Sequence, residues 1–234
     1  MTNDLNIANT IFPGFNDRRG IVLCGYEWGF SKQDKKDWEE GNISAPLEAE
    51  AIFSNKALRY GERALTWRYD NRILKWFELW GHPLSRVNLG GAFEKCIAQT
   101  NWCRTQNYEM DRDYYSKLTE KSNAENFLHH INALEPAVLI FFGSVMIDAL
   151  QAPLIKTRFS ELMGKEVAPL SRVQKDYPGR RFRVGFQSFE RCDVVSFPHP
   201  SSSRGLSDGY IALFNTEMSR LIEGVKIEKG VVSA

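Results

Sequence analysis

Two loops hold the residues best suited to chemistry, and they lie far apart in the sequence. The first loop is GYEWG at 25–29, which follows the apolar run GIVLC at 20–24 and contributes the carboxylate of Glu27. The second loop is PHPSSSRG at 198–205, which follows DVVSF at 193–197 and contributes the imidazole of His199. A carboxylate and a histidine are suited to acid–base catalysis and to the stabilisation of developing charge. The pair could therefore form one active site if the fold brings the two loops together.

The elements that must position these loops are short buried strands. Continuous apolar runs occupy residues 20–25, 137–142 and 193–197, and a weaker candidate, CIAQTNWC, occupies 96–103. Runs of this length, separated by helical segments, indicate a parallel sheet that is covered on both faces. The carboxyl ends of parallel strands lie at one edge of the sheet, so both loops should open on one cleft.

We therefore expect an α/β fold in which residues 1–234 form a single three-layer α/β/α domain. Its central sheet should be four-stranded and mainly parallel. The segment 156–191, which is rich in arginine and lysine, should form a hairpin or a long loop before the last strand.

The helices between the strands have recognisable faces and ends. Residues 70–80 (DNRILKWFELW) form an amphipathic helix that should stop at Gly81. Ser122 and Glu125 match a capping box, and Ser207 or Asp208 can cap the last helix. That helix has an apolar stripe typical of core packing: Ile211, Phe214, Met218, Leu221 and Ile222.

Composition places the chain among ordinary soluble globular proteins. Of its 234 residues, 43% are hydrophobic and 25% are charged, and the formal net charge is +1. This charge does not itself indicate a polyanionic partner, although a local basic face remains possible. The N-terminus resembles no signal peptide, and no apolar run approaches the roughly 20 residues that span a bilayer. We expect a cytoplasmic protein with no membrane partner.

The cysteines offer no metal site. Cys24, Cys96, Cys103 and Cys192 are scattered without a C-x-x-C pair, so zinc is not expected. Buried, reduced thiols are the simplest interpretation in a cytosolic protein. The sequence thus predicts no metal and no other cofactor.

Several short motifs, in order, resemble the uracil-DNA glycosylase superfamily. That superfamily carries a Gly-x-Asp-Pro-Tyr loop, or a variant of it, after its first strand and a His-Pro-Ser loop after its last. Gly25 and Glu27 match the first loop in part, and HPSSS at 199–203 matches the second. TNWCR at 100–104 and AVLIFFGSVMIDAL at 137–150 resemble segments of the iron–sulfur branch, and the whole resemblance spans roughly residues 20–222.

The chain also departs from the superfamily's pattern. Trp28 replaces the usual proline of the first loop. Only Cys103 falls at a cluster-ligand position, and since a cluster needs four cysteines, no iron–sulfur cluster is expected. The leucine that wedges into DNA in the best-known members is missing, and Ser203 and Arg204 occupy that neighbourhood.

The resemblance implies a DNA glycosylase, with DNA as partner and the protein acting as a monomer. It implies that Glu27 stabilises the oxocarbenium-like sugar and orients water, while His199 donates a hydrogen bond to the departing pyrimidine. Asn101 would read the edge of the base. The base would also be bound by the first loop and its flank, namely Gly25, Tyr26, Trp28, Gly29 and Phe30. Phosphates would be held by Ser201, Ser202 and Ser203, and Arg204 would fill the gap left by a flipped nucleotide.

Gly29 bears on the size of the base. In the superfamily's strict uracil enzymes this position is a tyrosine that blocks substituents at C5 of the pyrimidine, and a glycine removes that barrier. The protein could thus be a repair enzyme that releases uracil, or a defence enzyme that releases a C5-enlarged cytosine of phage DNA, such as glucosylated hydroxymethylcytosine. One motif leaves both possibilities open.

Other interpretations remain open at this stage. A member of the superfamily could bind DNA or a nucleotide without cleaving it, with Glu27 solvated and His199 serving only the turn. A serine hydrolase is a weaker alternative, because the chain lacks a Gly-x-Ser-x-Gly elbow. RRFR at 180–183 could contact DNA or form a solvated strand edge. The pair at 129–130 (HH) is expected on a helix surface.

Overall fold

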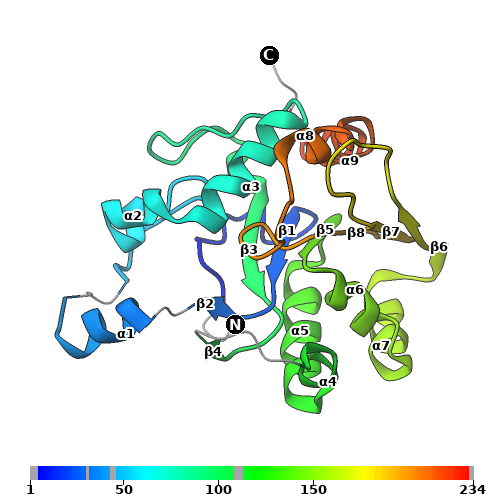
Figure 1. Cartoon of the computed structure of the whole chain (residues 1–234), viewed down its shortest axis with the longest axis horizontal. Coiled ribbons are helices and arrows are strands. Elements are labelled where there is room, and N and C mark those ends of the chain that lie inside the picture. The colour runs from blue at the N-terminus through cyan, green and yellow to red at the C-terminus, as the bar shows by residue number, and fades with distance from the viewer. Residues whose placement is uncertain (1–4, 30–31, 43–45, 108–112, 232–234) are drawn as a thin grey trace.

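Six strands form the main sheet of the protein, in the order β3-β1-β5-β8-β7-β6. The computed structural model describes residues 5–29, 32–42, 46–107 and 113–231. The strands are β1 (Ile21–Gly25), β3 (Ile97–Asn101), β5 (Val138–Phe142), β6 (Glu166–Val173), β7 (Val184–Phe189) and β8 (Cys192–Phe197). Four of them, β3, β1, β5 and β8, are parallel, and their carboxyl ends meet at one edge (Figure 1).

All four predicted strands are confirmed, but the prediction of a four-stranded sheet is wrong. The segment 156–191 contains most of α7 (Pro153–Met163) and then the antiparallel pair β6 and β7, so the predicted hairpin is present. Both of its strands join the sheet, because β7 is also antiparallel to β8. The reason that β6 is hard to see in the sequence is its position at the sheet edge, where most of its side chains are exposed. It therefore lacks the continuous apolar run of a buried strand.

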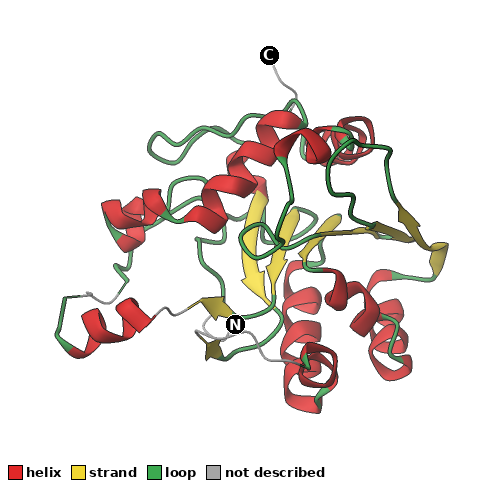
Figure 2. Ribbon diagram, viewed as in Figure 1, coloured by secondary structure: helices red, strands yellow, loops and turns green. Residues whose placement is uncertain are grey.

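The sheet is covered by helices on both faces, so the predicted layering is observed (Figure 2). Alternation along β1 divides its side chains between two cores. Ile21 and Leu23 pack in the core formed with α3 (Arg68–Leu79), α8 (Asp208–Ala212) and α9 (Asn215–Glu228). Val22 and Cys24 pack in the core formed with α5 (Lys121–Leu134), α6 (Ser144–Leu150) and α7.

Short helices and loops complete the chain. The α-helices are α1 (Lys32–Glu39), α2 (Ala57–Tyr60), α3 (Arg68–Leu79), α4 (Tyr114–Thr119), α5 (Lys121–Leu134), α6 (Ser144–Leu150), α7 (Pro153–Met163), α8 (Asp208–Ala212) and α9 (Asn215–Glu228). The 3-10 helices are η1 (Glu62–Thr66) and η2 (Glu94–Cys96), and a two-stranded sheet joins β2 (Trp28–Gly29) to β4 (Gln106–Asn107).

The helix ends agree with the sequence in part. The predicted helix at 70–80 is α3, and Ser207 caps α8 by accepting a hydrogen bond from the Tyr210 amide. The predicted capping box is wrong, because α5 already begins at Lys121 and Glu120 occupies its N-cap position without a side-chain cap. Glu120 has extended backbone angles directly after α4, so the chain turns before it reaches Ser122.

Two further expectations can be compared with the structure. The four cysteines are buried and free of disulfides. Of the histidine pair, His129 is exposed as expected, but His130 is only 1% exposed. Its Nε2 accepts a hydrogen bond from the Asn6 amide at 3.0 Å, and its Nδ1 donates to the Asn126 carbonyl at 2.8 Å. Burial lowers the pKa of His130 to about 4. His130 therefore anchors the N-terminal segment to α5.

Over the described part of the chain, each helix is too short or too polar to cross a lipid bilayer.

Candidate active site

The two loops do meet at the carboxyl edge of the sheet, where they border a cleft of about 610 Å³. Tyr26 from the loop after β1 and His199 from the loop after β8 both line this cleft. The two rings lie 6.4 Å apart, centroid to centroid, with only 18° between their planes. This juxtaposition follows from the parallel order β1-β5-β8, which places the two strand ends only one strand apart.

His199 is held as a neutral hydrogen-bond donor. Its Nδ1 accepts hydrogen bonds from the backbone amides of Ser201 at 3.2 Å and Ser202 at 3.1 Å. An amide can only donate, so Nδ1 carries no proton and the imidazole proton resides on Nε2. Burial lowers the pKa of His199 to about 4. At neutral pH the side chain therefore offers an uncharged Nε2–H.

Arg72 of α3 holds the backbone of the second loop. Its guanidinium donates to the carbonyl of Pro200 at 2.7 Å and to the carbonyl of Leu206, and it lies 3.7 Å from a carboxylate oxygen of Asp208. One planar group thus ties the beginning of the loop to its end. Arg72 has no signal in the sequence, since nothing in α3 marks it as different from other surface arginines.

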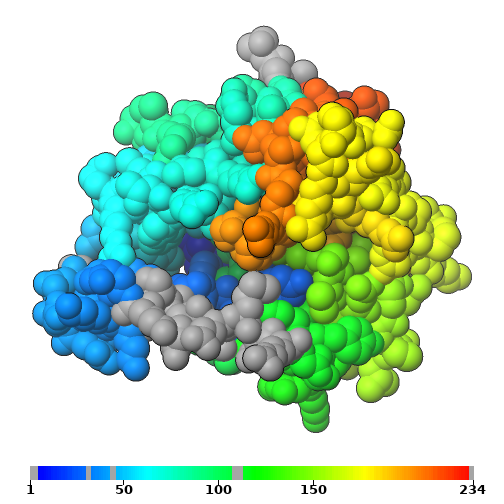
Figure 3. All heavy atoms as spheres, in the orientation of Figure 1, coloured from blue at the N-terminus to red at the C-terminus, as the bar shows by residue number. Residues whose placement is uncertain are grey.

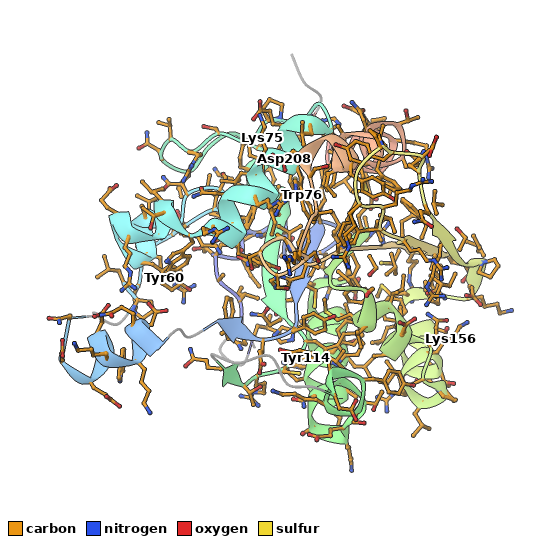
Figure 4. All side chains as sticks on the ribbon, in the orientation of Figure 1. Tyr60, Lys75, Trp76, Tyr114, Lys156 and Asp208 are labelled. Carbon is orange, nitrogen blue, oxygen red and sulfur yellow. The ribbon has the colours of Figure 1, made fainter. Side chains whose placement is uncertain are left out.

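Tyr26 is packed too tightly to move freely. It is 8% exposed, and its ring lies 4.5 Å from the ring of Tyr114. On its other side is Gly143, at the end of β5, where a Cβ would lie 2.3 Å from the Tyr26 ring. Gly143 also has a φ of +151°, so two independent constraints favour glycine there. Tyr114 extends the cleft wall toward α4 (Figure 4).

Gly25 and Asn101 are neighbours at the ends of β1 and β3, where they are paired in register. A Cβ on Gly25 would lie 2.3 Å from Oδ1 of Asn101, so the asparagine side chain occupies the space that any other residue would need. Asn101 is 4% exposed. The predicted binding residues Gly25 and Asn101 therefore touch each other below the cleft.

Glu27 is placed differently from Tyr26 and His199. Its carboxylate is 2.7 Å from the Lys117 ammonium and accepts a 2.7 Å hydrogen bond from the Thr105 hydroxyl. The Tyr114 hydroxyl lies 3.5 Å from the other carboxylate oxygen. Glu27 does not line the cleft, whereas another carboxylate, that of Asp148 in α6, does line it and pairs with Arg172.

The rest of the first loop leads away from the cleft. Trp28 and Gly29 form β2, which pairs with β4. Trp28 is half-buried and Gly29 is exposed, with nothing within 4 Å of a Cβ built on it. Neither residue lines the cleft. Phe30, the remaining predicted binding residue, lies outside the described residues.

The hydroxyl-rich part of the second loop borders the cleft. Ser202 and Ser203 line it, and Ser201 is exposed beside them. Arg204 is also exposed, and its carbonyl accepts a 2.8 Å hydrogen bond from the Arg180 guanidinium. A ligand that extends from the cleft toward solvent along this loop would therefore pass these residues.

Arginines form part of the cleft wall. The cleft is lined by Arg172 of β6 and by Arg180, Arg181 and Arg183 from the segment before β7. That segment is fixed to the second loop and to α8, because Ser207 donates to the Tyr177 hydroxyl at 2.9 Å and Tyr210 donates to the Phe182 carbonyl. In Figure 3 the yellow segment lies beside the orange loop on one face of the molecule.

The charges of these arginines are only partly balanced. Arg172 pairs with Asp148, and Arg181 lies 3.0 Å from the highly exposed Asp176. Arg183 forms no ion pair with any residue in the described ranges. From the sequence, RRFR at 180–183 could form either a solvated strand edge or a contact surface. In the structure these four residues line the cleft.

Metal binding receives no support from the described residues, which contain no cluster of three or more His, Cys, Asp or Glu side chains arranged to hold an ion.

Chemically, the arrangement offers a neutral imidazole donor, an aromatic wall, a cationic wall and two carboxylates at different distances from the cleft. Such a site suits the departure of an anionic group from a bulky, negatively charged ligand. No protein-family model matches this chain, and no curated protein matches it either.

Proposed function

We propose that the protein is a DNA glycosylase that hydrolyses the N-glycosidic bond of a pyrimidine nucleotide and leaves an abasic site. The observation that carries this proposal is the tautomer of His199, whose Nδ1 accepts two backbone amides and whose Nε2–H is left to donate beside the cleft. The motif resemblance to the uracil-DNA glycosylase superfamily and the parallel order of the four central strands add support.

The chemistry would follow the build-up of charge. As the glycosidic bond lengthens, negative charge develops on the base and positive charge on the sugar. A donor aimed at a base oxygen lowers the barrier because it binds the charged transition state better than the neutral ground state. A neutral histidine suits this role, since it can donate without first competing with solvent for a proton.

A carboxylate would stabilise the sugar cation and orient the attacking water. Glu27 is the candidate from the motif, but its ion pair with Lys117 compensates its charge away from the cleft. Asp148 lines the cleft and is the alternative. Substitution of Glu27 and Asp148 one at a time can decide which of the two carboxylates acts in the reaction.

The size of the cleft favours a large base within this proposal. A volume of about 610 Å³ is in the range of pockets that accept drug-sized ligands, and a single pyrimidine ring would leave much of it empty. A C5-enlarged cytosine, such as the glucosylated hydroxymethylcytosine of phage DNA, would use that volume. Uracil released in repair is the smaller alternative.

A binding protein without catalytic activity is the second candidate. It is favoured by one observation, the compensated Glu27 carboxylate, because a catalytic carboxylate is expected to face the reacting sugar. In this case the cleft would hold a flipped base or a nucleotide without hydrolysis.

Mass spectrometry of bases released from DNA distinguishes these proposals. Purified protein is incubated with unmodified DNA, uracil-containing DNA and DNA with glucosylated hydroxymethylcytosine, and each product is also tested for abasic sites. The His199→Ala variant serves as the matched control and should release base at least about 100-fold more slowly. The defect should be smallest for bases that leave easily. Tight binding without release from any of the three DNAs would instead establish the second candidate.

A further inference from the structure

Tyr69 carries a buried hydroxyl that has no hydrogen-bond partner in the described part of the chain. The residue lies in the first turn of α3. Most buried polar groups are paired, so an unpaired one calls for a physical reason. A structural core would be as stable, or more so, with phenylalanine at this position, because no hydrogen bond would be lost.

Tyr69 does not itself line the cleft, but it packs against His199, which does. Its ring centroid lies 5.3 Å from that of His199, and its edge packs on Phe142 at the end of β5. A Cβ on Gly25 would lie 3.2 Å from the Tyr69 hydroxyl and 2.3 Å from Oδ1 of Asn101. The hydroxyl and the amide therefore flank the same glycine at the carboxyl ends of the strands.

The chemistry of these two groups is complementary to a pyrimidine edge. The Asn101 side chain offers one acceptor and two donors, and it forms no hydrogen bond with another described residue. The Tyr69 hydroxyl can donate one bond and accept others. Burial raises the pKa of Tyr69 well above its ordinary value, so the hydroxyl keeps its proton throughout the neutral range.

We propose that the Tyr69 hydroxyl is a substrate-binding group that forms a hydrogen bond with a polar edge atom of the bound pyrimidine, next to Asn101. This inference rests on the proposed glycosylase function and adds a residue for which the superfamily motifs in the sequence gave no signal. Bound base would satisfy the hydroxyl, for which the described residues provide no partner.

Tyr210 provides a matched control on the same face of the sheet. It is fully buried, like the Tyr69 hydroxyl, but its hydroxyl is satisfied because it donates to the Phe182 carbonyl and accepts from the Lys175 amide at 3.3 Å. Removal of this hydroxyl leaves protein groups without a partner, whereas removal of the Tyr69 hydroxyl does not.

The experiment compares Tyr69→Phe with Tyr210→Phe in thermal stability, in single-turnover base release and in binding of free pyrimidine bases by calorimetry. We expect Tyr69→Phe to keep or raise the melting temperature while it slows base release and weakens base binding, each by at least about 10-fold. Its binding to DNA with an abasic site, which lacks the base, should be unchanged. Tyr210→Phe should lower the melting temperature, because it leaves the Phe182 carbonyl and the Lys175 amide without this partner.

Several outcomes would overturn the inference. If Tyr69→Phe melts lower and releases and binds base like the wild type, the hydroxyl holds a structural water and the proposal is wrong. If the wild type releases base and Tyr69→Phe does so equally fast, only the role of Tyr69 fails. If the wild-type protein neither releases nor binds any pyrimidine base, the proposed function fails and the inference fails with it.

Discussion

The Lys117 ammonium lies 2.7 Å from the Glu27 carboxylate, and the two side chains are only 16% and 6% exposed. An ion pair this well buried fixes both side chains and compensates the charge of the glutamate. Glu27 can therefore stabilise the fold, act in the reaction, or do both. Lys117 has to be substituted as well to separate these roles.

The first prediction concerns the carboxylate that supports base release. If Glu27 acts in the reaction, Glu27→Gln should reduce base release by at least about 100-fold while DNA binding is retained, since the change keeps shape and removes charge. Asp148→Asn should then have a small effect. Rates are measured under single-turnover conditions with whichever of the three DNAs gives the fastest base release.

Lys117→Met is the control for a structural role. If the ion pair only stabilises the fold, Lys117→Met and Glu27→Gln should lower the melting temperature by similar amounts and leave the rate largely unchanged. A large rate loss in Asp148→Asn with a normal rate in Glu27→Gln would transfer the role to Asp148.

The second prediction concerns stability at acidic pH. Burial holds the pKa of His130 at about 4, below its ordinary value of 6.5. Between these values the unfolded chain binds a proton that the folded protein resists. The contribution of His130 to the free energy of unfolding should therefore be complete above pH 6.5. It should decrease as the pH falls toward 4, by up to about 1.4 kcal/mol per pH unit. His199 acts in the same direction.

His130→Gln should make the free energy of unfolding less dependent on pH between 6.5 and 4, even if it is lower at pH 7. His129→Gln, at the exposed neighbouring position, is the control and should keep the wild-type dependence. Urea titrations at pH 7, 6 and 5 provide the measurement. If the free energy of unfolding depends on pH equally in His130→Gln and in the wild type, His130 is not the titrating group.

The third prediction uses two glycines of the first loop. Gly25→Ala should reduce both stability and base binding, because its Cβ would lie 2.3 Å from Oδ1 of the buried Asn101 and force that side chain to move. Gly29→Ala should change neither, since open space surrounds that position. Melting temperature and base affinity are compared in the two variants. If Gly25→Ala has the melting temperature and the base affinity of the wild type, the strand ends can relax and the close packing with Asn101 is unimportant.

The fourth prediction concerns the arginine wall. If Arg183 contacts a DNA phosphate, Arg183→Gln should weaken binding and reduce the slope of log K against log salt by about 0.9 for duplex DNA, or about 0.7 for a single strand. Arg158→Gln, on the exposed surface of α7 away from the cleft, should leave the slope unchanged. Fluorescence titrations at several salt concentrations are sufficient. If log K depends on log salt equally in Arg183→Gln and Arg158→Gln, the DNA does not contact Arg183.

Local pattern in the sequence determined the four central strands, the amphipathic α3 and a helix cap at Ser207 or Asp208, because apolar runs, periodicity and capping residues are local properties. The structure selects Ser207. It also indicated that the loops after β1 and β8 would open on one cleft, since parallel strands have their carboxyl ends at one edge. Of the predicted pair, however, His199 lines the cleft and Glu27 does not. The edge strand β6 could not be identified in this way, because it is stabilised by pairing with β7 and has no apolar run of its own.

Only the tertiary structure decided which groups are paired and which have no partner among the described residues. Lys117 lies 90 residues from Glu27, and Arg72 lies 128 residues from the loop carbonyl that it holds. Neither contact has a sequence signal, because ion pairs and hydrogen bonds between distant segments depend on how the helices pack on the sheet. The unpaired hydroxyl of Tyr69 has the same origin: its sequence neighbours specify a helix, and the arrangement of Gly25, Asn101 and His199 around it exists only after folding.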